Sequence, residues 1–508
     1  MQSLARTSQA LSVAPSLFID AGPATWYRSD GPPAGIQRRR KKEAMTQPVY
    51  DFDLVCIGSG PAGQRAAVQA AKIGKRVAVV ERSKAMGGGC LQTGTIPSKT
   101  LREAILGIHL RQHNGASPVT AQRPTAAALL ERVNDVVCRE QAVVEHQLHR
   151  NDIATLYGDA SFVDPHTIEI RAADNTRRVS AAHVLVACGT QPTPPPWVQP
   201  DGETILLSDD VMRLQQLPRS LTVIGAGVIG IEYASMFAQI GLDVTLIDQR
   251  SRPLEFMDHE IVDELIHQMR KRRVTFRLGE AVTSISVVTE PHRRAVIELE
   301  SGKRIVSEVA LFSVGRRGAT DGLMLANAGL TADNRGRIAV DDTYRTAVPH
   351  IMAAGDVIGF PSLAATSSEQ GRLASCFAFD VPARPMAPHF PIGIYAIPEM
   401  SMVGSTEHTL TSERVPYEVG LARYREIARG QIVGDDSGLF KMIFHRQTRK
   451  LLGAHAIGTG ATELIHIGQA VLALGGTLDY FLETVFNYPT LAECYKIAAL
   501  DASNKLAL

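Results

Sequence analysis

The sequence has few cysteines, almost no net charge and no long apolar run. Its six cysteines among 508 residues are scattered, which argues against the disulfide framework of a small secreted protein. Lysine and arginine number 53 against 52 acidic residues, so the net charge of +1 offers no global field to nucleic acid or an anionic membrane. No stretch approaches the roughly 18 uninterrupted apolar residues of a membrane-spanning helix. We therefore expect a multidomain cytoplasmic enzyme that binds neither nucleic acid nor a membrane.

Residues 1–47 lack the apolar periodicity of the rest of the chain. They contain two clusters of proline and glycine and a basic run from Arg38 to Lys42. Three interpretations stay open: a disordered tail, a transit peptide, or an extension from a wrongly annotated upstream start codon, with Met45 as the true start. We exclude this segment from the fold.

One pattern occurs twice: a short apolar run, a glycine turn, a helix, and a second apolar run that ends on an acid. The first copy places Gly58-Ser-Gly60-Pro-Ala-Gly63 after the run 52–57 and ends on Glu81. The second places Gly225-Ala-Gly227-Val-Ile-Gly230 after 221–224 and ends on Asp248. In both copies the acid lies 23 residues after the first glycine. This repeat predicts two doubly wound units in an α/β protein.

Each glycine of such a turn has its own task. The first makes the strand-to-helix turn, the second lets a pyrophosphate approach the backbone, and the third lets the helix pack onto the strand. The diphosphate then lies at the positive end of the helix, and the acid accepts hydrogen bonds from a ribose. Asp248 favours the 2′-hydroxyl of NAD over a 2′-phosphate. Arg250 and Arg252 follow it, and they either meet a phosphate or belong to a solvated loop.

The remaining chain also alternates between helical and strand-like segments. We expect helices over 98–114 and 124–149, short strands over 154–171, a strand at 184–187 and a stiff proline-rich linker at 192–196. From about residue 385 a separate α+β region follows. Its expected strands are 392–396, 440–444 and 451–457, and its expected helices are 461–474 and 490–501.

The segment 87–99, Gly-Gly-Gly-Cys-Leu-Gln-Thr-Gly-Thr-Ile-Pro-Ser-Lys, resembles the active-site helix of the flavoprotein disulfide reductases. That family includes dihydrolipoamide dehydrogenase, glutathione reductase and mercuric reductase. The strings 313–316, 353–356 and 398–407 match it too, so the resemblance spans about 50–505. It implies two Rossmann-like domains and a dimerisation domain. Their expected bounds are 48–197 with 329–384 for FAD, 198–328 for NAD(P), and 385–508 for dimerisation of a homodimer.

Two departures from that family concern the thiol chemistry. Thr95 replaces the second cysteine of the redox pair, and Tyr488 replaces the histidine base in the string 488–493. A tyrosine, with a pKa near ~10, does not serve as a neutral-pH proton shuttle. The sequence is similar in both places to the soluble pyridine nucleotide transhydrogenases, a branch of the same family. The resemblance implies one non-covalent FAD per subunit, NAD(H) and NADP(H) as substrates, and reversible ping-pong hydride transfer between them.

The resemblance also assigns site residues. Those expected to contact FAD are Gly58, Gly60, Gly63, Glu81, Arg82, Gly88, Gly89, Cys90, Lys99, Ala160, Gly189, Asp356 and Ala364. Those expected to contact NAD(P) are Gly225, Gly227, Gly230, Glu232, Asp248, Arg250 and Gly315. Lys99, paired with Glu232, is expected beside flavin N5, where a cation stabilises negative charge. Glu493 is expected to reach the flavin of the other subunit.

Cys90 permits two interpretations: a soft apolar neighbour of the flavin, or a vestigial thiolate. An NAD(P)H:quinone or dye reductase on the same fold is the alternative function, and a non-catalytic flavoprotein redox sensor that uses Cys90 is a third. No Cys/His cluster has the spacing of a zinc site, so we expect no metal.

Overall fold

The structure, a computed structural model, describes residues 50–113 and 124–506. The three interpretations of residues 1–47 therefore concern a segment outside the described residues. From residue 50 onward, the described chain forms one compact unit. In the described part of the chain, no helix combines the length and the apolar character that a membrane span requires.

The first sheet has seven strands, and its centre is parallel. Along its main path the strand order is β3-β2-β1-β6-β5-β4, and β17 pairs with β6 off that path. The first half of β6 forms an antiparallel ladder with β5, while its second half lies between β1 and β17 in parallel register. The predicted strand 184–187 is thus only the buried end of a longer strand. The strands are β1 (Phe52–Ile57), β2 (Val77–Glu81), β3 (Ala154–Tyr157), β4 (Asp159–Phe162), β5 (Thr167–Arg171), β6 (Thr176–Val186) and β17 (Ile351–Ala353).

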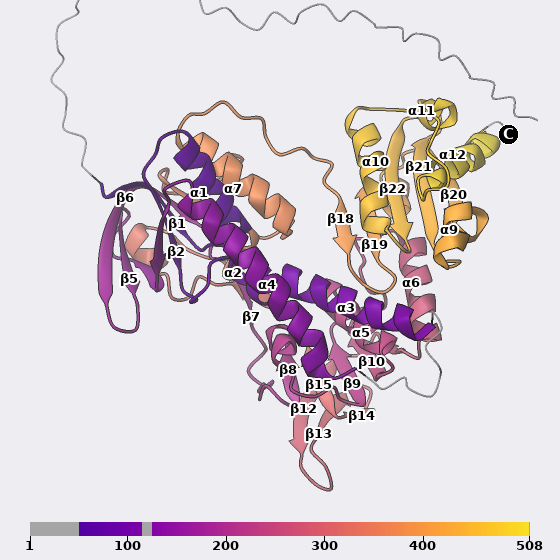
Figure 1. The fold of residues 1–508 in the computed structure, drawn as a ribbon, viewed down its shortest axis with the longest axis horizontal. Helices are drawn as coiled ribbons and strands as arrows, with labels where there is room; N and C mark the ends of the chain where they lie inside the picture. The colour runs from indigo at the N-terminus through magenta and orange to yellow at the C-terminus, as the bar shows by residue number, and fades with distance from the viewer. Residues whose placement is uncertain (1–49, 114–123, 507–508) are drawn as a thin grey trace, which may run out of the picture. The chain divides into compact units, whose positions relative to one another are not determined.

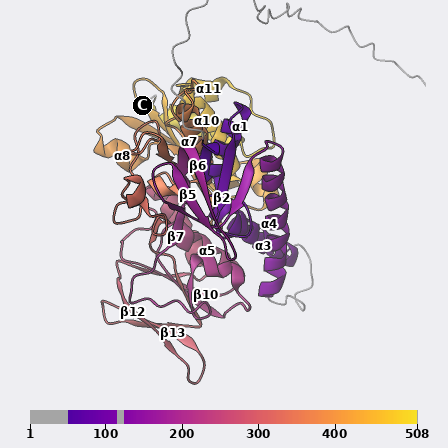
Figure 2. The same cartoon turned by 90° about the vertical axis from the view of Figure 1, so that its left-hand side faces the viewer.

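Two groups of helices accompany this sheet. α1 (Pro61–Lys72) and α7 (Ala364–Ala378) lie side by side (Figure 1) and pack so closely that a Cβ on Gly371 would lie 2.0 Å from the Ala62 carbonyl oxygen. α3 (Thr95–His113) and α4 (Ala126–His149) form a second pair (Figure 2), preceded by the short α2 (Gly88–Gln92). α3 begins three residues before the predicted helix, so Thr95 and Lys99 share its first turns.

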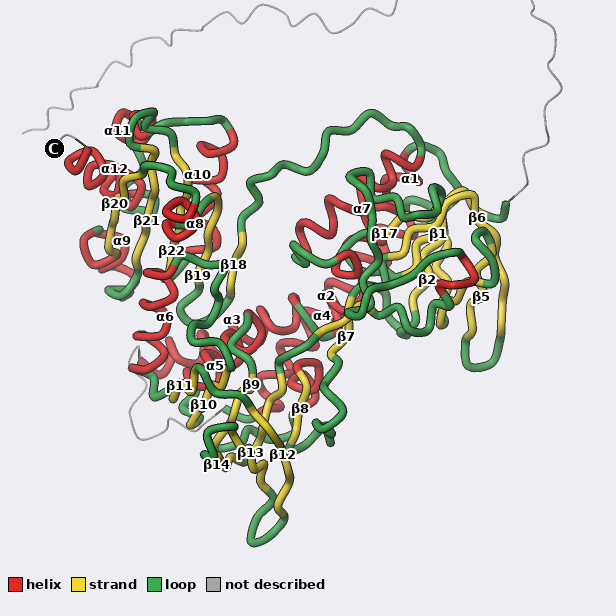
Figure 3. Tube along the Cα trace, turned by 180° about the vertical axis from the view of Figure 1, so that it is seen from behind, coloured by secondary structure: helices red, strands yellow, loops and turns green. Residues whose placement is uncertain are grey.

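The second sheet is entirely parallel, with the order β11-β10-β9-β15-β8. α5 is buried over most of its length, which explains its almost uniformly apolar sequence. A small antiparallel sheet, β12-β13-β14, belongs to the same stretch of chain, and Figure 3 shows it at the bottom of the view. The elements are β8 (Ile205–Leu207), β9 (Ser220–Ile224), α5 (Val228–Gln239), β10 (Asp243–Asp248), α6 (His259–Lys271), β11 (Thr275–Leu278), β12 (Val282–Val288), β13 (Arg294–Leu299), β14 (Arg304–Ser307) and β15 (Val309–Phe312).

The chain passes from the first sheet to the second and back again at one place. β7 (Thr190–Pro192) and β16 (Arg316–Gly318) pair there as a short antiparallel ribbon. The predicted proline-rich linker therefore begins inside a paired strand.

The third sheet is antiparallel, with the order β18-β19-β22-β21-β20. α10 contacts β19 and β22, and α12 contacts β20 and β21. This arrangement agrees with the α+β region predicted after residue 385, although α12 begins and ends later than the predicted helix 490–501. The elements are β18 (Ile392–Ile394), β19 (Met400–Gly404), α8 (Glu407–Ser412), β20 (Tyr417–Arg423), α9 (Ala428–Val433), β21 (Leu439–His445), β22 (Leu451–Ile457), α10 (Ala461–Ala473), α11 (Leu478–Glu483) and α12 (Glu493–Leu506).

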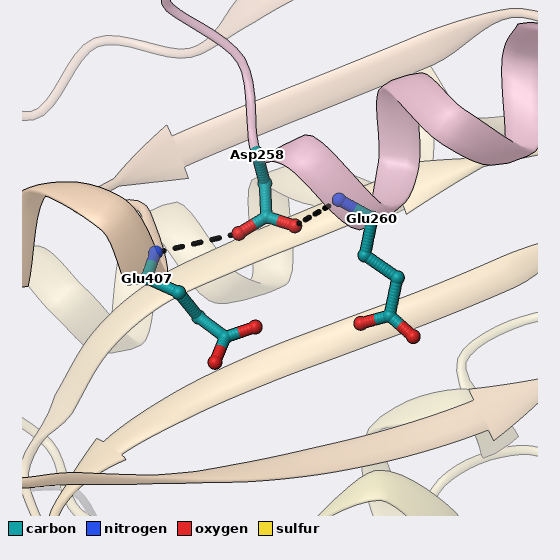
Figure 4. Close-up of side chains that lie close together, drawn as sticks. All are labelled: Asp258, Glu260 and Glu407. Atoms are coloured by element: carbon teal, nitrogen blue, oxygen red, sulfur yellow. Dashed lines mark hydrogen bonds between the residues drawn. The ribbon is translucent and has the colours of Figure 1, made fainter. Parts of the chain in front are cut away.

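A buried lysine joins the unit around the second sheet to the third sheet. The Lys441 side chain on β21 is fully buried, and its ammonium lies 2.9 Å from Asp258 and 3.0 Å from Glu260, and also contacts Glu407. The three carboxylates lie close enough together to share a cation (Figure 4). The ammonium of Lys441 lies among them and supplies that positive charge. Its removal would leave buried negative charge without a partner.

Candidate active site

The first glycine turn has the geometry that the sequence predicts for a dinucleotide site. Gly58 has φ +109°, and a Cβ there would lie 2.3 Å from the Ala187 carbonyl oxygen. A Cβ on Gly63 would lie 1.9 Å from the carbonyl oxygen of Gly58, because helix and strand meet there. A Cβ on Gly60, in contrast, would meet no atom within 4 Å. The second glycine therefore faces open space at the N-terminus of α1, where a diphosphate fits.

The second glycine turn repeats this geometry. Gly225 has φ +105°, and a Cβ on Gly230 would lie 1.8 Å from the Gly225 carbonyl oxygen. A Cβ on Gly227, at the N-terminus of α5, would again meet no atom within 4 Å. The residues present therefore fit two dinucleotides, one at each turn.

The two strand-end acids are buried and point back toward their glycine turns. Glu81 accepts hydrogen bonds from the Ser59 amide at 3.1 Å and from the Ser59 hydroxyl at 2.5 Å. Asp248 accepts from the Ala226 amide at 2.6 Å, and Arg250 forms an ion pair with it at 2.7 Å. Burial opposes ionisation of Asp248, but the bonds from Arg250 and Ala226 hold its pKa below the usual value.

The segment that carries Cys90 lies against the first glycine turn. A Cβ on Gly88, which has φ +61°, would lie 2.8 Å from the Cα of Gly60. Cys90 on α2 is a free thiol, and Thr95 occupies the position of the missing second sulfur. Burial raises the pKa of Cys90, and a hydrogen bond with Thr95 opposes that rise only partly. The thiol is therefore neutral near pH 7, which favours the soft, apolar interpretation over the thiolate.

Lys99 and Glu232 form an ion pair that joins the unit around the first sheet, which carries Lys99, to the unit around the second sheet, which carries Glu232. The Lys99 ammonium lies 2.7 and 2.9 Å from the two oxygens of Glu232, whose side chain is only 6% exposed. The side chain of Lys99 is 25% exposed. The sequence predicts this pair, and the structure brings the two residues together.

Asp356 lies where the ribbon, α7 and the first sheet meet. Burial raises the pKa of its carboxyl, while Arg316 and hydrogen bonds with Ser367 and Thr190 oppose the rise. The other residues predicted to contact a nucleotide differ in their exposure. Gly89, Arg82 and Gly315 are exposed, Gly189 and Ala364 are half-buried, and Ala160 is buried in β4. Whether each contacts a nucleotide stays a prediction.

Tyr488 and Glu493 belong to the C-terminal region. Tyr488 is 69% exposed. Glu493 begins α12, and its carboxylate accepts a hydrogen bond from the Thr490 amide at 3.1 Å. Within this subunit Glu493 therefore caps its own turn, and a role at the flavin of another subunit stays a prediction.

Sequence reasoning missed a polar network beside the Cys90 segment. Arg316 donates to the carbonyl and hydroxyl oxygens of Thr190 at 2.9 and 3.0 Å, and forms an ion pair with Asp209 at 3.2 Å. Asp209 also accepts from the Thr93 hydroxyl at 3.2 Å. The string that ends in Arg316 was recognisable as a family motif, but its partners lie more than 100 residues away.

The fold and these two nucleotide turns define an oxidoreductase that uses FAD and pyridine nucleotides. The profile described as "Pyridine nucleotide-disulphide oxidoreductase" matches residues 52–371, and its dimerisation domain matches residues 390–499. The chain belongs to this family. The predicted fold class, family and cofactors are thereby confirmed, whereas the domain bounds stay predictions.

Similar proteins extend over nearly the whole chain. A soluble pyridine nucleotide transhydrogenase of Mycobacterium bovis is 51% identical over 463 residues, which cover 90% of this chain and 98% of the relative. One from Photobacterium profundum is 42% identical over 90% of this chain and 98% of its own. Among solved structures, LpdA from Mycobacterium tuberculosis has a TM-score of 0.81 at 26% identity, covering 88% of this chain and 99% of that chain. The HOCl-induced flavoprotein disulfide reductase RclA from Escherichia coli has a TM-score of 0.80 at 26% identity, with the same coverage.

Proposed function

We propose that the protein catalyses reversible hydride transfer between NADPH and NAD⁺ by a ping-pong mechanism, without a redox disulfide. One observation carries the proposal: both nucleotide turns and the Lys99–Glu232 pair are retained, while Cys90 faces Thr95 in place of a second thiol. The transhydrogenase names of the relatives that cover 90% of the chain support the same reaction.

Bound FAD supplies the chemistry, because its ring accepts a hydride from one nicotinamide and passes it to the next. The chain's own residues hold the reactants. The helix ends at Gly60 and Gly227 bind the two diphosphates, and Glu81 and Asp248 bind the riboses. Lys99, oriented by Glu232, stabilises negative charge at the flavin. Burial raises the pKa of Cys90, which argues against a thiolate sensor.

The proposal includes a cytoplasmic homodimer. Three large apolar or aromatic side chains of the C-terminal region are exposed in the single chain: Leu474 at 86%, Val485 at 93% and Tyr488 at 69%. We propose that these side chains become covered in the dimer, since the dimerisation domain of the family matches residues 390–499. All six cysteines, each within the described residues, are unpaired, which suits a reducing compartment.

The test compares electron acceptors with NADPH as the donor. The purified holoprotein should reduce thio-NAD⁺ faster than a soluble quinone at equal concentration. Quinone turnover that exceeds thio-NAD⁺ turnover would instead identify a quinone reductase. Loss of both activities with FAD still bound would support the sensor interpretation.

A further inference from the structure

Three consecutive residues of the C-terminal region form hydrogen bonds with α3 and α5, the helices that carry Lys99 and Glu232. The amide of Tyr395 donates to Glu232 at 2.9 Å. The carbonyl oxygen of Ala396 accepts from Arg102 of α3 at 2.9 Å, and the amide of Ile397 donates to the Ser235 hydroxyl of α5 at 3.0 Å. The backbone of this segment, residues 395–397, is therefore held in place against both helices.

A buried ion pair fixes the same segment from its other side. Arg102 lies 2.9 Å from Glu399, and both side chains are less than a tenth exposed. Glu399 also accepts from the amide and hydroxyl of Thr462 at 3.3 and 3.2 Å, so α10 joins the network. Since Arg102 follows Lys99 by one helical turn, the position of Lys99 is coupled to the C-terminal region.

The ring of Tyr395 completes the surroundings of the lysine. The Lys99 ammonium lies over this ring, 5.0 Å from its centroid, while Glu232 holds it from another direction. A cation over an aromatic face is attracted by the ring's quadrupole, and more strongly where water is excluded. The hydroxyl of Tyr395 contributes to neither contact, because it forms a hydrogen bond with Thr462.

We propose that Tyr395 is a positioning residue, which holds the Lys99 ammonium through its ring and orients Glu232 through its peptide amide. Without the ring, Lys99 keeps its ion pair but loses the surface that limits its rotamers. The cation then stabilises negative charge at the flavin less well, because a mobile charge is not preorganised. The proposal deepens the proposed function, yet it concerns the reduction of FAD by any nicotinamide donor.

The experiment compares Tyr395→Leu, which removes the ring, with Tyr395→Phe, which keeps it. The rate of reduction of bound FAD by NADH, measured in a single turnover, should fall about fivefold in Tyr395→Leu. The dissociation constant of NADH should change less than about twofold, and the midpoint potential of the bound FAD should become more negative. Tyr395→Phe should match the parent protein in all three measurements.

A double-substitution cycle separates this role from simple packing. In a Lys99→Met background, Tyr395→Leu should have no further effect on the reduction rate or on the potential. Equal slowing by Tyr395→Leu with and without Lys99 would overturn the proposal, and so would equal effects of the Phe and Leu substitutions. Tyr395→Met serves as a second ring-deleting variant, and loss of FAD from both would show that the ring supports the fold and not the lysine. Absence of thio-NAD⁺ turnover in the parent would refute the proposed function but leave this comparison valid.

Discussion

The two nucleotide-binding units share their backbone geometry but differ in charge. In both, the third glycine lies against the carbonyl of the first, and the second faces open space. In the first unit the strand-end acid, Glu81, is bound by the neutral hydroxyl of Ser59. In the second unit Asp248 is paired with the guanidinium of Arg250. The first acid accepts hydrogen bonds from neutral groups of Ser59, whereas the second is paired with a cation.

This difference bears on the choice of nucleotide. A lone carboxylate at Asp248 would repel the 2′-phosphate of NADP and so favour NAD. The Arg250 side chain is 39% exposed, and among the described residues its guanidinium donates hydrogen bonds to Asp248. We expect the guanidinium to exchange that contact for a 2′-phosphate when NADP binds. Arg252 is held by Asp263 instead. We therefore expect this unit, with its acid and its arginine, to accept both NAD and NADP.

The units also differ in what holds them. The first relies on the close packing of α1 on α7, whereas the second is tied to the third sheet by Lys441.

Lys441→Met should lower the free energy of unfolding by about 3–5 kcal/mol, because three carboxylates lose a buried partner. Thermal and denaturant unfolding of the apoprotein would measure it. Lys303→Met, which breaks the exposed pair with Glu280, is the matched control and should cost less than about 1 kcal/mol. Equal losses of unfolding free energy in the two variants would mean that the buried ion pairs of Lys441 stabilise the fold no more than an exposed ion pair does.

Substituting the third glycine of one unit at a time should separate the two binding functions. Gly63→Ala should weaken FAD binding about 10- to 100-fold, because its Cβ forces strand and helix apart. Gly230→Ala should keep its FAD but lose reduction by NADH and NADPH. Absorbance near ~450 nm and the rate of its bleaching report the two results. If Gly230→Ala loses its FAD and Gly63→Ala retains it, the assignment of the two units is reversed.

The Asp248–Arg250 pair should control the ratio of NADPH to NADH use. Asp248→Asn removes the carboxylate charge and frees Arg250, so kcat/KM for NADPH should rise about tenfold, with a smaller loss for NADH. Arg250→Ala should cost NADPH more than NADH, and Arg252→Ala is the control. Steady-state kinetics at low and high salt would show the dependence on screening. An unchanged ratio in both variants would mean that this pair does not face the ribose.

A further expected effect is confined to low pH and concerns the cluster around Lys441. His455 on β22 is fully buried, its Nδ1 has no hydrogen-bond partner among the described residues, and burial lowers its pKa to about 4. In the unfolded chain the imidazole of His455 takes up a proton near pH ~6.5, whereas in the folded chain it does so only near pH 4. The contribution of His455 to the free energy of unfolding is therefore fully present above pH ~6.5 and falls as the pH approaches 4. The loss is at most about 1.4 kcal/mol per pH unit from this one group. Unfolding midpoints of the parent and of His455→Asn should converge as the pH falls, and parallel curves would contradict the argument.

The sequence was sufficient where the relevant contacts are local. Both glycine turns follow from residues within one strand–turn–helix unit, and the distances at Gly63 and Gly230 agree with the tasks assigned to them. The bounds of β6 were wrong because its first half pairs with β5 in a polar hairpin, which has no continuous apolar run.

Contacts between distant segments could not be predicted in the same way. Lys99 and Glu232 were identified through a family resemblance and not through their spacing. Tyr395 and Glu399 lie almost 300 residues from their partners on α3, Lys99 and Arg102, and no local pattern marks them. Lys441 lies within an apolar strand, and this pattern alone indicates a buried ion pair, since a fully buried lysine requires carboxylate partners.

We propose that hydride passes between two nicotinamide nucleotides in a protein that lacks the dithiol and its histidine base. The most direct test measures NADPH oxidation by the purified holoprotein with thio-NAD⁺, lipoamide or glutathione disulfide as the sole acceptor. We expect turnover with thio-NAD⁺ and none above background with either disulfide, because Thr95 and Tyr488 replace the required groups. Reduction of either disulfide by the unaltered protein would contradict it.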